Sequence, residues 1–283
     1  MNTFNTLIGV EALHALLAQD VPLRILDASF DLADPGAGAR SYAESRLPGA
    51  AHIDLEHDLS GAKLPGGVGG RHPLPTRDAF AATVGRLGIA PGLQVVVCDR
   101  NGGFYASRAW WMLRWLGHAE AAVLDGGLAA WAAQHPLESG AVTATAQAPY
   151  PAGESLVTLT DADELQRRLG RWPLIDARAA ERFRGDVEPL DARAGHIPGA
   201  LNRHFARNLS ANGLFKPAEL LRAEFSELLG NAPAAEVVHQ CGSGVTACHN
   251  LLAMEHAGLH GSRLYPGSWS EWSADASRPV ALG

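Results

Sequence analysis

The chain has 283 residues, of which 47% are hydrophobic and 19% charged, a globular composition long enough for two domains. Its 30 acidic residues outnumber its 23 Lys and Arg residues, and the net charge of −7 argues against sequence-independent binding of nucleic acid. No apolar run is long enough to cross a membrane, and the N-terminus lacks the pattern of a signal peptide. We therefore expect a cytoplasmic protein with no membrane partner.

Short apolar runs alternate with amphipathic stretches along the whole chain. This alternation predicts an α/β fold with buried parallel strands and flanking helices. The runs expected as strands lie at 24–28, 94–99, 121–126, 173–177, 236–240 and 262–267. The stretches expected as helices lie at 10–19, 79–88, 108–117, 162–170, 217–230 and 247–256.

The sequence contains an internal repeat. Asp27 in the first half corresponds to Asp176 in the second, and residues 48–50 and 198–200 both read Pro-Gly-Ala. Similar agreement continues in the same order to the end of both halves, with only small changes of offset. Chance does not produce this many ordered matches, so we expect a duplicated domain.

The repeat sets the expected domain organisation. A first domain is predicted at 1–140 and a second at 156–283. The stretch 141–155 is small, polar and contains proline, which is typical of a linker.

One cysteine of the second repeat occupies a position suited to chemistry. Cys241 follows the strand expected at 236–240 and precedes the helix expected at 247–256, and ligands of parallel sheets bind at such strand ends. Gly242 and Gly244 allow the loop to curl with its N–H groups pointing inward. Such a nest, together with the start of a helix, favours the thiolate, the nucleophilic form of cysteine.

The loop CGSGVTA at 241–247 resembles the active-site loop of the mercaptopyruvate sulfurtransferases, which belong to the rhodanese superfamily. The resemblance implies two tandem rhodanese-like domains, each a parallel sheet flanked by helices, with catalysis in the second. Asp99 stands where the first repeat would carry the cysteine, as expected for a non-catalytic copy. Further similar segments are DARAAERFRG at 176–185, AGHIPGALN at 194–202, RAWWMLRWLGH at 108–118 and GSWSEW at 267–272.

The resemblance also implies a reaction. Cys241 is expected to take sulfur from 3-mercaptopyruvate as a persulfide and to pass it to a thiophilic acceptor, such as cyanide, a small thiol or a thioredoxin-like protein. The partners are therefore a small-molecule donor and acceptor. No metal and no organic cofactor are implied.

Several binding residues follow from the same resemblance. Arg182 is expected to hold the donor carboxylate, for which the guanidinium fork is suited. Relatives carry a second arginine shortly downstream, where this chain has Leu190, and Arg193 is the candidate replacement. The loop residues expected to line the donor site are Gly242, Gly244, Val245 and Thr246.

A proton relay has been proposed for the family. Its expected members here are Ser243, His72 in the segment GGRHPLP, and an acid, either Asp54 or Glu56. The hydroxyl of Ser243 or Thr246 is expected to hydrogen-bond the keto oxygen of the donor or the departing enolate.

The sequence allows three alternative functions to be compared with this one. Thiosulfate-preferring enzymes have basic residues after the cysteine, whereas Gly242 and Ser243 are uncharged, so mercaptopyruvate is favoured and thiosulfate remains the alternative donor. A cysteine phosphatase needs an arginine where this chain has Ala247, which excludes that class. A persulfide carrier without turnover stays open. Cys98 and Cys248 are expected to be buried thiols.

Overall fold

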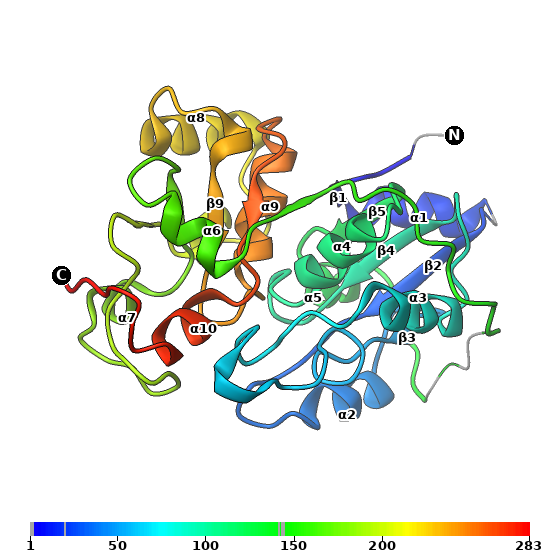
Figure 1. Cartoon of the computed structure of the whole chain (residues 1–283). Coiled ribbons are helices and arrows are strands. Elements are labelled where there is room, and N and C mark those ends of the chain that lie inside the picture. Colours follow the sequence, from blue (N-terminus) through cyan, green and yellow to red (C-terminus); the bar gives the residue numbers. More distant parts are fainter. Residues whose placement is uncertain (1–2, 20, 141, 143–144) are drawn as a thin grey trace. The chain divides into compact units, whose positions relative to one another are not determined.

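The computed structural model describes residues 3–19, 21–140, 142 and 145–283 (Figure 1). The chain folds into two compact units, and a short segment of each half of the sequence packs with the unit formed mainly by the other half. Part of the expected linker, residues 141, 143 and 144, lies outside the described residues. Unit 1 comprises Met1–Ser60, Pro75–Leu156 and Ala211–Leu214, and unit 2 comprises Gly61–Leu74, Val157–Ser210 and Phe215–Gly283.

Unit 1 contains a parallel five-stranded sheet in the order β1-β5-β4-β2-β3. The strands are β1 (Leu7–Ile8), β2 (Leu23–Asp27), β3 (Ala51–His52), β4 (Gln94–Cys98) and β5 (Ala121–Leu124). The helices are α1 (Val10–Ala18), α2 (Ala37–Glu44), α3 (Arg77–Arg86), α4 (Ala106–Trp115) and α5 (Gly127–Ala132).

Both faces of this sheet are buried, which explains why its strands read as unbroken apolar runs. Ile25 and Val96 point to one face, where they form a core with α1 and α5. Val95 and Val97, which alternate with Val96 along the strand, are equally buried on the opposite face.

Unit 2 repeats this topology, with the strand order β6-β10-β9-β7-β8 and every neighbouring pair parallel. The internal repeat of the sequence therefore corresponds to a repeat of the fold. The strands are β6 (Thr158–Leu159), β7 (Leu174–Asp176), β8 (Leu201–Asn202), β9 (Val238–Gln240) and β10 (Arg263–Leu264). The helices are α6 (Ala162–Arg167), α7 (Ala180–Arg184), α8 (Ala218–Leu229), α9 (Ala247–His256) and α10 (Ser268–Ala274).

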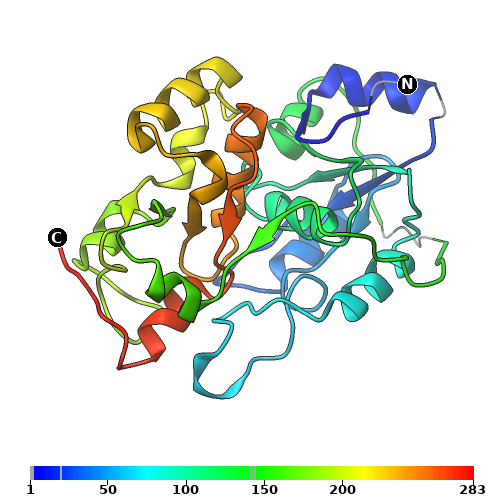
Figure 2. The same ribbon diagram turned by 45° about the horizontal axis from the view of Figure 1, so that its top comes forward.

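Helices cover both faces of the second sheet as well (Figure 2). Leu165 of α6 and Trp272 of α10 belong to the core on one face. On the other face, Nε2 of His239 lies 3.1 Å from the sulfur of Met254 in α9. Burial lowers the pKa of His239 to about 3, so this histidine is a neutral core residue.

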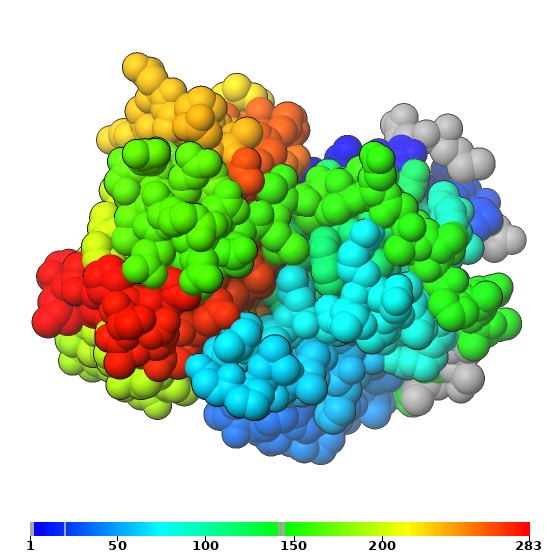
Figure 3. Space-filling model, viewed as in Figure 1, coloured from blue at the N-terminus to red at the C-terminus, as the bar shows by residue number. Residues whose placement is uncertain are grey.

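The segment Gly61–Leu74 comes from the first half of the sequence but packs on α10. The N–H of Gly69 donates to Oε1 of Glu271 at 2.8 Å. A Cβ added at Gly70, whose φ is +73°, would lie 2.4 Å from the carbonyl oxygen of Gly267, so only glycine fits there. The C-terminal residues lie on the surface of the same unit (red in Figure 3), where the N–H of Ala281 donates to the carbonyl of His196 at 2.9 Å.

The six helices expected from the sequence are present, and each of their ends lies within three residues of its expected position. The longest helix of the described chain, α8, has 12 residues. Within the described residues, no helix has the length and apolar character needed to cross a membrane.

Candidate active site

Cys241 is the first residue after β9 and is 1% exposed. Its backbone is fixed from both sides, because its N–H donates to the hydroxyl of Ser268 at 3.2 Å and its carbonyl accepts from the N–H of Trp269 at 3.0 Å. The start of α10 therefore sets the position of the cysteine.

Ser268 adopts a backbone conformation that serine normally avoids. Its φ of +54° makes it the one non-glycine residue with positive φ in the described part of the chain, and its counterpart in the first repeat is Gly127 with φ +56°. The serine hydroxyl accepts from Cys241 and donates to the carbonyl of Tyr265 at 3.0 Å. Strain of this kind persists where a function requires the side chain, here to hold the residue that carries the thiol.

The loop after Cys241 presents unpaired donors. A Cβ at Gly244, with φ +75°, would lie 2.3 Å from the carbonyl oxygen of Pro266, so the tight turn requires glycine. Four backbone N–H groups of this loop donate to no acceptor within the described chain, and they can bind an anion. They belong to Gly242, Ser243, Val245 and Thr246.

The matching loop of unit 1 already holds an anion of its own. The carboxylate of Asp99, the counterpart of Cys241, is buried and accepts four backbone hydrogen bonds at 2.8–3.0 Å. Burial raises the pKa of Asp99, and these N–H groups act in the opposite direction. Unit 1 thus shows the same loop of the fold closed around a carboxylate. The donors are the N–H groups of Asn101, Gly103, Tyr105 and Ala106.

We predict that Asp99→Ala lowers the free energy of unfolding by about 3–5 kcal/mol, because several buried N–H groups lose their acceptor. Urea titration monitored by circular dichroism measures this. Asp31→Ala is the control, since the Asp31 carboxylate accepts from Ala33 on the surface. Equal stability of the two variants would mean that the four bonds contribute little.

Ser243 and His72 meet in unit 2 although they are 171 residues apart in sequence. Nδ1 of His72 lies 2.8 Å from Oγ of Ser243, and both residues are buried. The structure therefore brings together two of the expected relay residues. Of the two candidate acids, Asp54 accepts through Oδ1 from the N–H groups of Glu56 and His57 in its own loop, at 2.8 and 2.9 Å.

Arg182 lies in α7 and is held by two buried carboxylates. Its Nη2 donates to Glu188 at 2.7 Å and to Asp191 at 3.0 Å. Asp191 also forms an ion pair with Arg71, a residue that the sequence did not single out. Because Arg71 directly precedes His72, the same segment supplies both side chains. In the sequence, the signal for this segment is the glycine pair at residues 69 and 70 that precedes it.

The two arginines lie over the loop at Gly242. A Cβ built at this glycine would be 3.0 Å from Nη2 of Arg71 and 3.4 Å from Nη1 of Arg182. Neither of these nitrogens donates to any residue that the structure describes. Two guanidinium nitrogens therefore remain available beside the residue that follows Cys241, and a carboxylate is the group that they would hold.

Arg193 is engaged elsewhere. Its guanidinium donates to four backbone carbonyls around the end of α10, at 2.6–3.1 Å, and Leu190 is half exposed. These bonds use the guanidinium of Arg193 to join segments of the fold, so its donors are directed away from a substrate role. The carbonyls belong to Trp272, Ser273, Asp275 and Arg278.

The remaining loop and cysteine residues are packed. Val245 is buried, and Thr246 immediately precedes α9. The thiol of Cys248 donates to the carbonyl of Gly244 at 3.4 Å. Burial raises the pKa of Cys98 well above its ordinary value, which keeps that residue a thiol.

The comparisons with known proteins agree with this geometry. The family model for the rhodanese-like domain matches twice, at residues 10–134 and 161–275. The chain therefore belongs to the rhodanese family, with two domains in tandem.

Within that family, a Pseudomonas aeruginosa protein named as a 3-mercaptopyruvate sulfurtransferase is 46% identical over 280 residues, covering 98% of each chain. SseB of Mycobacterium tuberculosis, whose name gives thiosulfate as the donor, is 40% identical over 98% of this chain and 97% of its own. The crystal structure of the 3-mercaptopyruvate sulfurtransferase SseA from Escherichia coli matches 94% of this chain and 100% of that chain, with a TM-score of 0.79 and 32% identity. The chain is thus similar to full-length sulfurtransferases.

Proposed function

We propose that this protein transfers sulfur from 3-mercaptopyruvate through a persulfide on Cys241. The observation that carries the proposal is the pairing of a cysteine on an open N–H loop with two arginine nitrogens that have no acceptor. The catalytic unit is the second repeat, 156–283, together with the loop Gly61–Leu74. Apart from that loop, we assign the first repeat, within 1–140, no role in the chemistry, because Asp99 stands where it would carry the cysteine.

In the first half-reaction the Cys241 thiolate attacks the sulfur of the donor. A sulfur–sulfur bond forms and the carbon–sulfur bond breaks, with its electron pair moving into the enolate of pyruvate. The thiol proton of the donor is transferred to the enolate carbon, which gives pyruvate and leaves an anionic persulfide. The N–H groups of Gly242, Ser243, Val245 and Thr246 would stabilise that charge.

Ser243 and His72 are assigned to the proton transfer. The Ser243 hydroxyl, placed by its 2.8 Å contact with Nδ1 of His72, would donate to the keto oxygen as the enolate develops. Because both side chains are buried, bulk water is kept from competing for that oxygen.

The donor preference follows from the charges beside Gly242. Arg71 and Arg182 carry two positive charges, and Asp191 and Glu188 balance them. The carboxylate of 3-mercaptopyruvate adds one negative charge to this neutral group, whereas thiosulfate adds two. The carboxylate would accept from the two available arginine nitrogens, whereas the second negative charge of thiosulfate has no further cation to balance it. Two like charges about 4 Å apart repel each other by about 4 kcal/mol at an effective dielectric constant of about 20.

The second half-reaction delivers the outer sulfur to a thiophilic acceptor, for which we propose a small thiol, cyanide or a thioredoxin-like protein. The three cysteines, all free thiols, suit a reducing cytoplasmic compartment.

We predict that kcat/KM for 3-mercaptopyruvate exceeds that for thiosulfate at least about tenfold, a difference of about 1.4 kcal/mol. The measurement is the initial rate of thiocyanate formation with cyanide as acceptor, at donor concentrations below KM. A higher kcat/KM with thiosulfate would make thiosulfate the donor and refute the charge argument. Persulfide formation that is not followed by turnover with any acceptor would instead indicate a carrier.

A further inference from the structure

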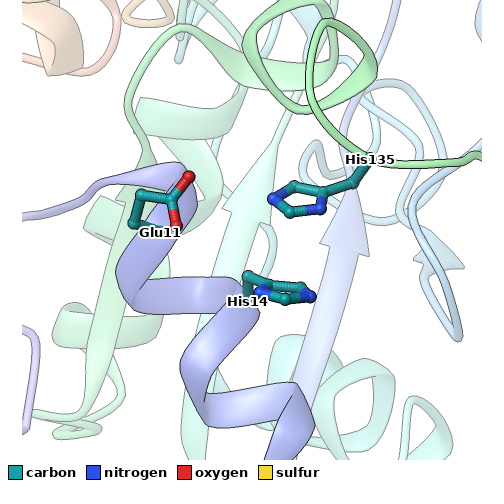
Figure 4. Close-up of side chains that lie close together, drawn as sticks. All are labelled: Glu11, His14 and His135. Atoms are coloured by element: carbon teal, nitrogen blue, oxygen red, sulfur yellow. The ribbon is translucent and has the colours of Figure 1, made fainter.

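A second group of reactive side chains lies in unit 1, outside the proposed active site. Glu11 and His14 project from α1, three residues apart on one side of the helix, and His135 reaches toward them from the loop after α5 (Figure 4). One carboxylate oxygen and one nitrogen from each ring lie within 4.8 Å of one another.

The backbone that carries these side chains is anchored. Leu13 of α1 is fully buried in the core of unit 1. The N–H of His135 donates to the carbonyl of Trp131 at 2.9 Å, and Nε1 of Trp131 donates to the carbonyl of Pro136 at 3.0 Å. A ligand for the three side chains would therefore meet positions that are already fixed.

The cluster has unused polar atoms. Among the described residues, the side chains of Glu11, His14 and His135 have no partner for a hydrogen bond or an ion pair. The two imidazole rings are stacked with centroids 4.1 Å apart, and Nε2 of His135 is buried without a hydrogen bond. By contrast, the exposed His57 and His260 each lie within 2.8 Å of a carboxylate.

We propose that Glu11, His14 and His135 form a binding site for a divalent transition-metal ion, with Zn²⁺ as the reference ion. Two imidazoles and one carboxylate are ligands that such ions prefer, and three protein ligands leave one position for water. Ligand atoms around tetrahedral zinc lie about 3.4 Å apart, as expected for bonds of about 2.1 Å. The ligand atoms already lie within 4.8 Å of one another, and side-chain rotation on the two anchored segments would bring them to that spacing.

A bound ion would join α1 to the loop after α5, two segments more than a hundred residues apart in the sequence. Since the ion would bind only the folded unit, it should stabilise unit 1 in proportion to its occupancy. Binding requires neutral imidazoles, so it should weaken as the pH falls. The proposal is independent of the sulfur chemistry.

The test is calorimetric titration of the full chain with ZnCl₂. It uses the Cys241→Ser background, because a reactive thiolate also binds zinc. We expect one ion per chain with micromolar affinity. His14→Ala and His135→Ala should each weaken binding at least about tenfold and abolish the zinc-dependent rise in Tm, and Glu11→Gln should weaken it less. His260→Ala is the matched control, and we expect it to bind as the parent does.

Absence of binding by the parent, or an affinity in both histidine variants equal to that of the parent, would overturn the proposal. A second measurement identifies the ligands directly. The electron paramagnetic resonance spectrum of the Cu²⁺-loaded protein should show coupling to two imidazole nitrogens, and His14→Ala should reduce this to one. Circular dichroism establishes that each variant is folded.

Discussion

Replacing Cys241 with serine is expected to abolish sulfur transfer, lowering kcat by at least about a thousandfold with either donor. The hydroxyl of serine neither forms a persulfide nor ionises at neutral pH, while the loop and the two arginines stay in place. Rates of pyruvate and thiocyanate formation measure the loss. Intact-protein mass after donor treatment should show one added sulfur in the parent, removable by cyanide, and none in the variant.

The other two cysteines provide the controls for this experiment. Cys98→Ala and Cys248→Ala should retain most of the activity of the folded enzyme, because both thiols are buried and the pKa of Cys98 is raised by burial. Mapping of the persulfide to Cys98, or loss of turnover in its alanine variant at unchanged stability, would refute the assignment of Cys241 as nucleophile.

The second large effect is expected at the arginines beside Gly242. A charge-assisted hydrogen bond to the donor carboxylate contributes about 1.5–3 kcal/mol. Arg71→Ala and Arg182→Ala should therefore each lower kcat/KM for 3-mercaptopyruvate about ten- to a hundredfold. Transfer from preformed persulfide to cyanide should change little, because cyanide has no carboxylate. Stopped-flow measurement of the two half-reactions separates these effects.

Substitution of Arg71 gives the clearer test, because it disturbs the buried ion pairs less than substitution of Arg182 does. Without the Arg71 side chain, Asp191 keeps its ion pair with Arg182. Without the Arg182 side chain, the buried carboxylates of Glu188 and Asp191 each lose an ion pair. Arg182→Lys keeps the charge without the fork and should fall between the parent and alanine. Arg184→Ala, in the same helix but paired with Asp186 at the surface, should leave kcat/KM unchanged. An unchanged kcat/KM in Arg71→Ala would show that Arg71 does not bind the donor.

Most of the fold could be predicted from the sequence because each sheet is buried on both faces. Long apolar runs such as residues 94–98 then identify the central strands without ambiguity. The sequence does not predict the edge strands β1, β3, β6 and β8, since two residues each are too few to show any periodicity.

The site was predictable where it is local in sequence. The loop from Cys241 to Thr246 is one continuous segment, so its glycines and its place between a strand and a helix could be recognised together. Arg71 could not be found this way, because a chain segment from the other half of the sequence brings it to Gly242. Arg193 has the right residue type three residues beyond the expected position, but its surroundings offer four carbonyl acceptors that no sequence pattern indicates.

The carboxylate of Asp99 is an intramolecular ligand of the four N–H groups of its own loop. Its carboxylate belongs to the loop that binds it, so its effective concentration at the four N–H groups exceeds that of any diffusing anion. A diffusing donor would have to displace this tethered carboxylate, so the loop at Asp99 serves the structure of unit 1. Of the two copies of this loop, one is therefore occupied by its own carboxylate, and the other keeps the N–H groups that we propose hold the persulfide of Cys241.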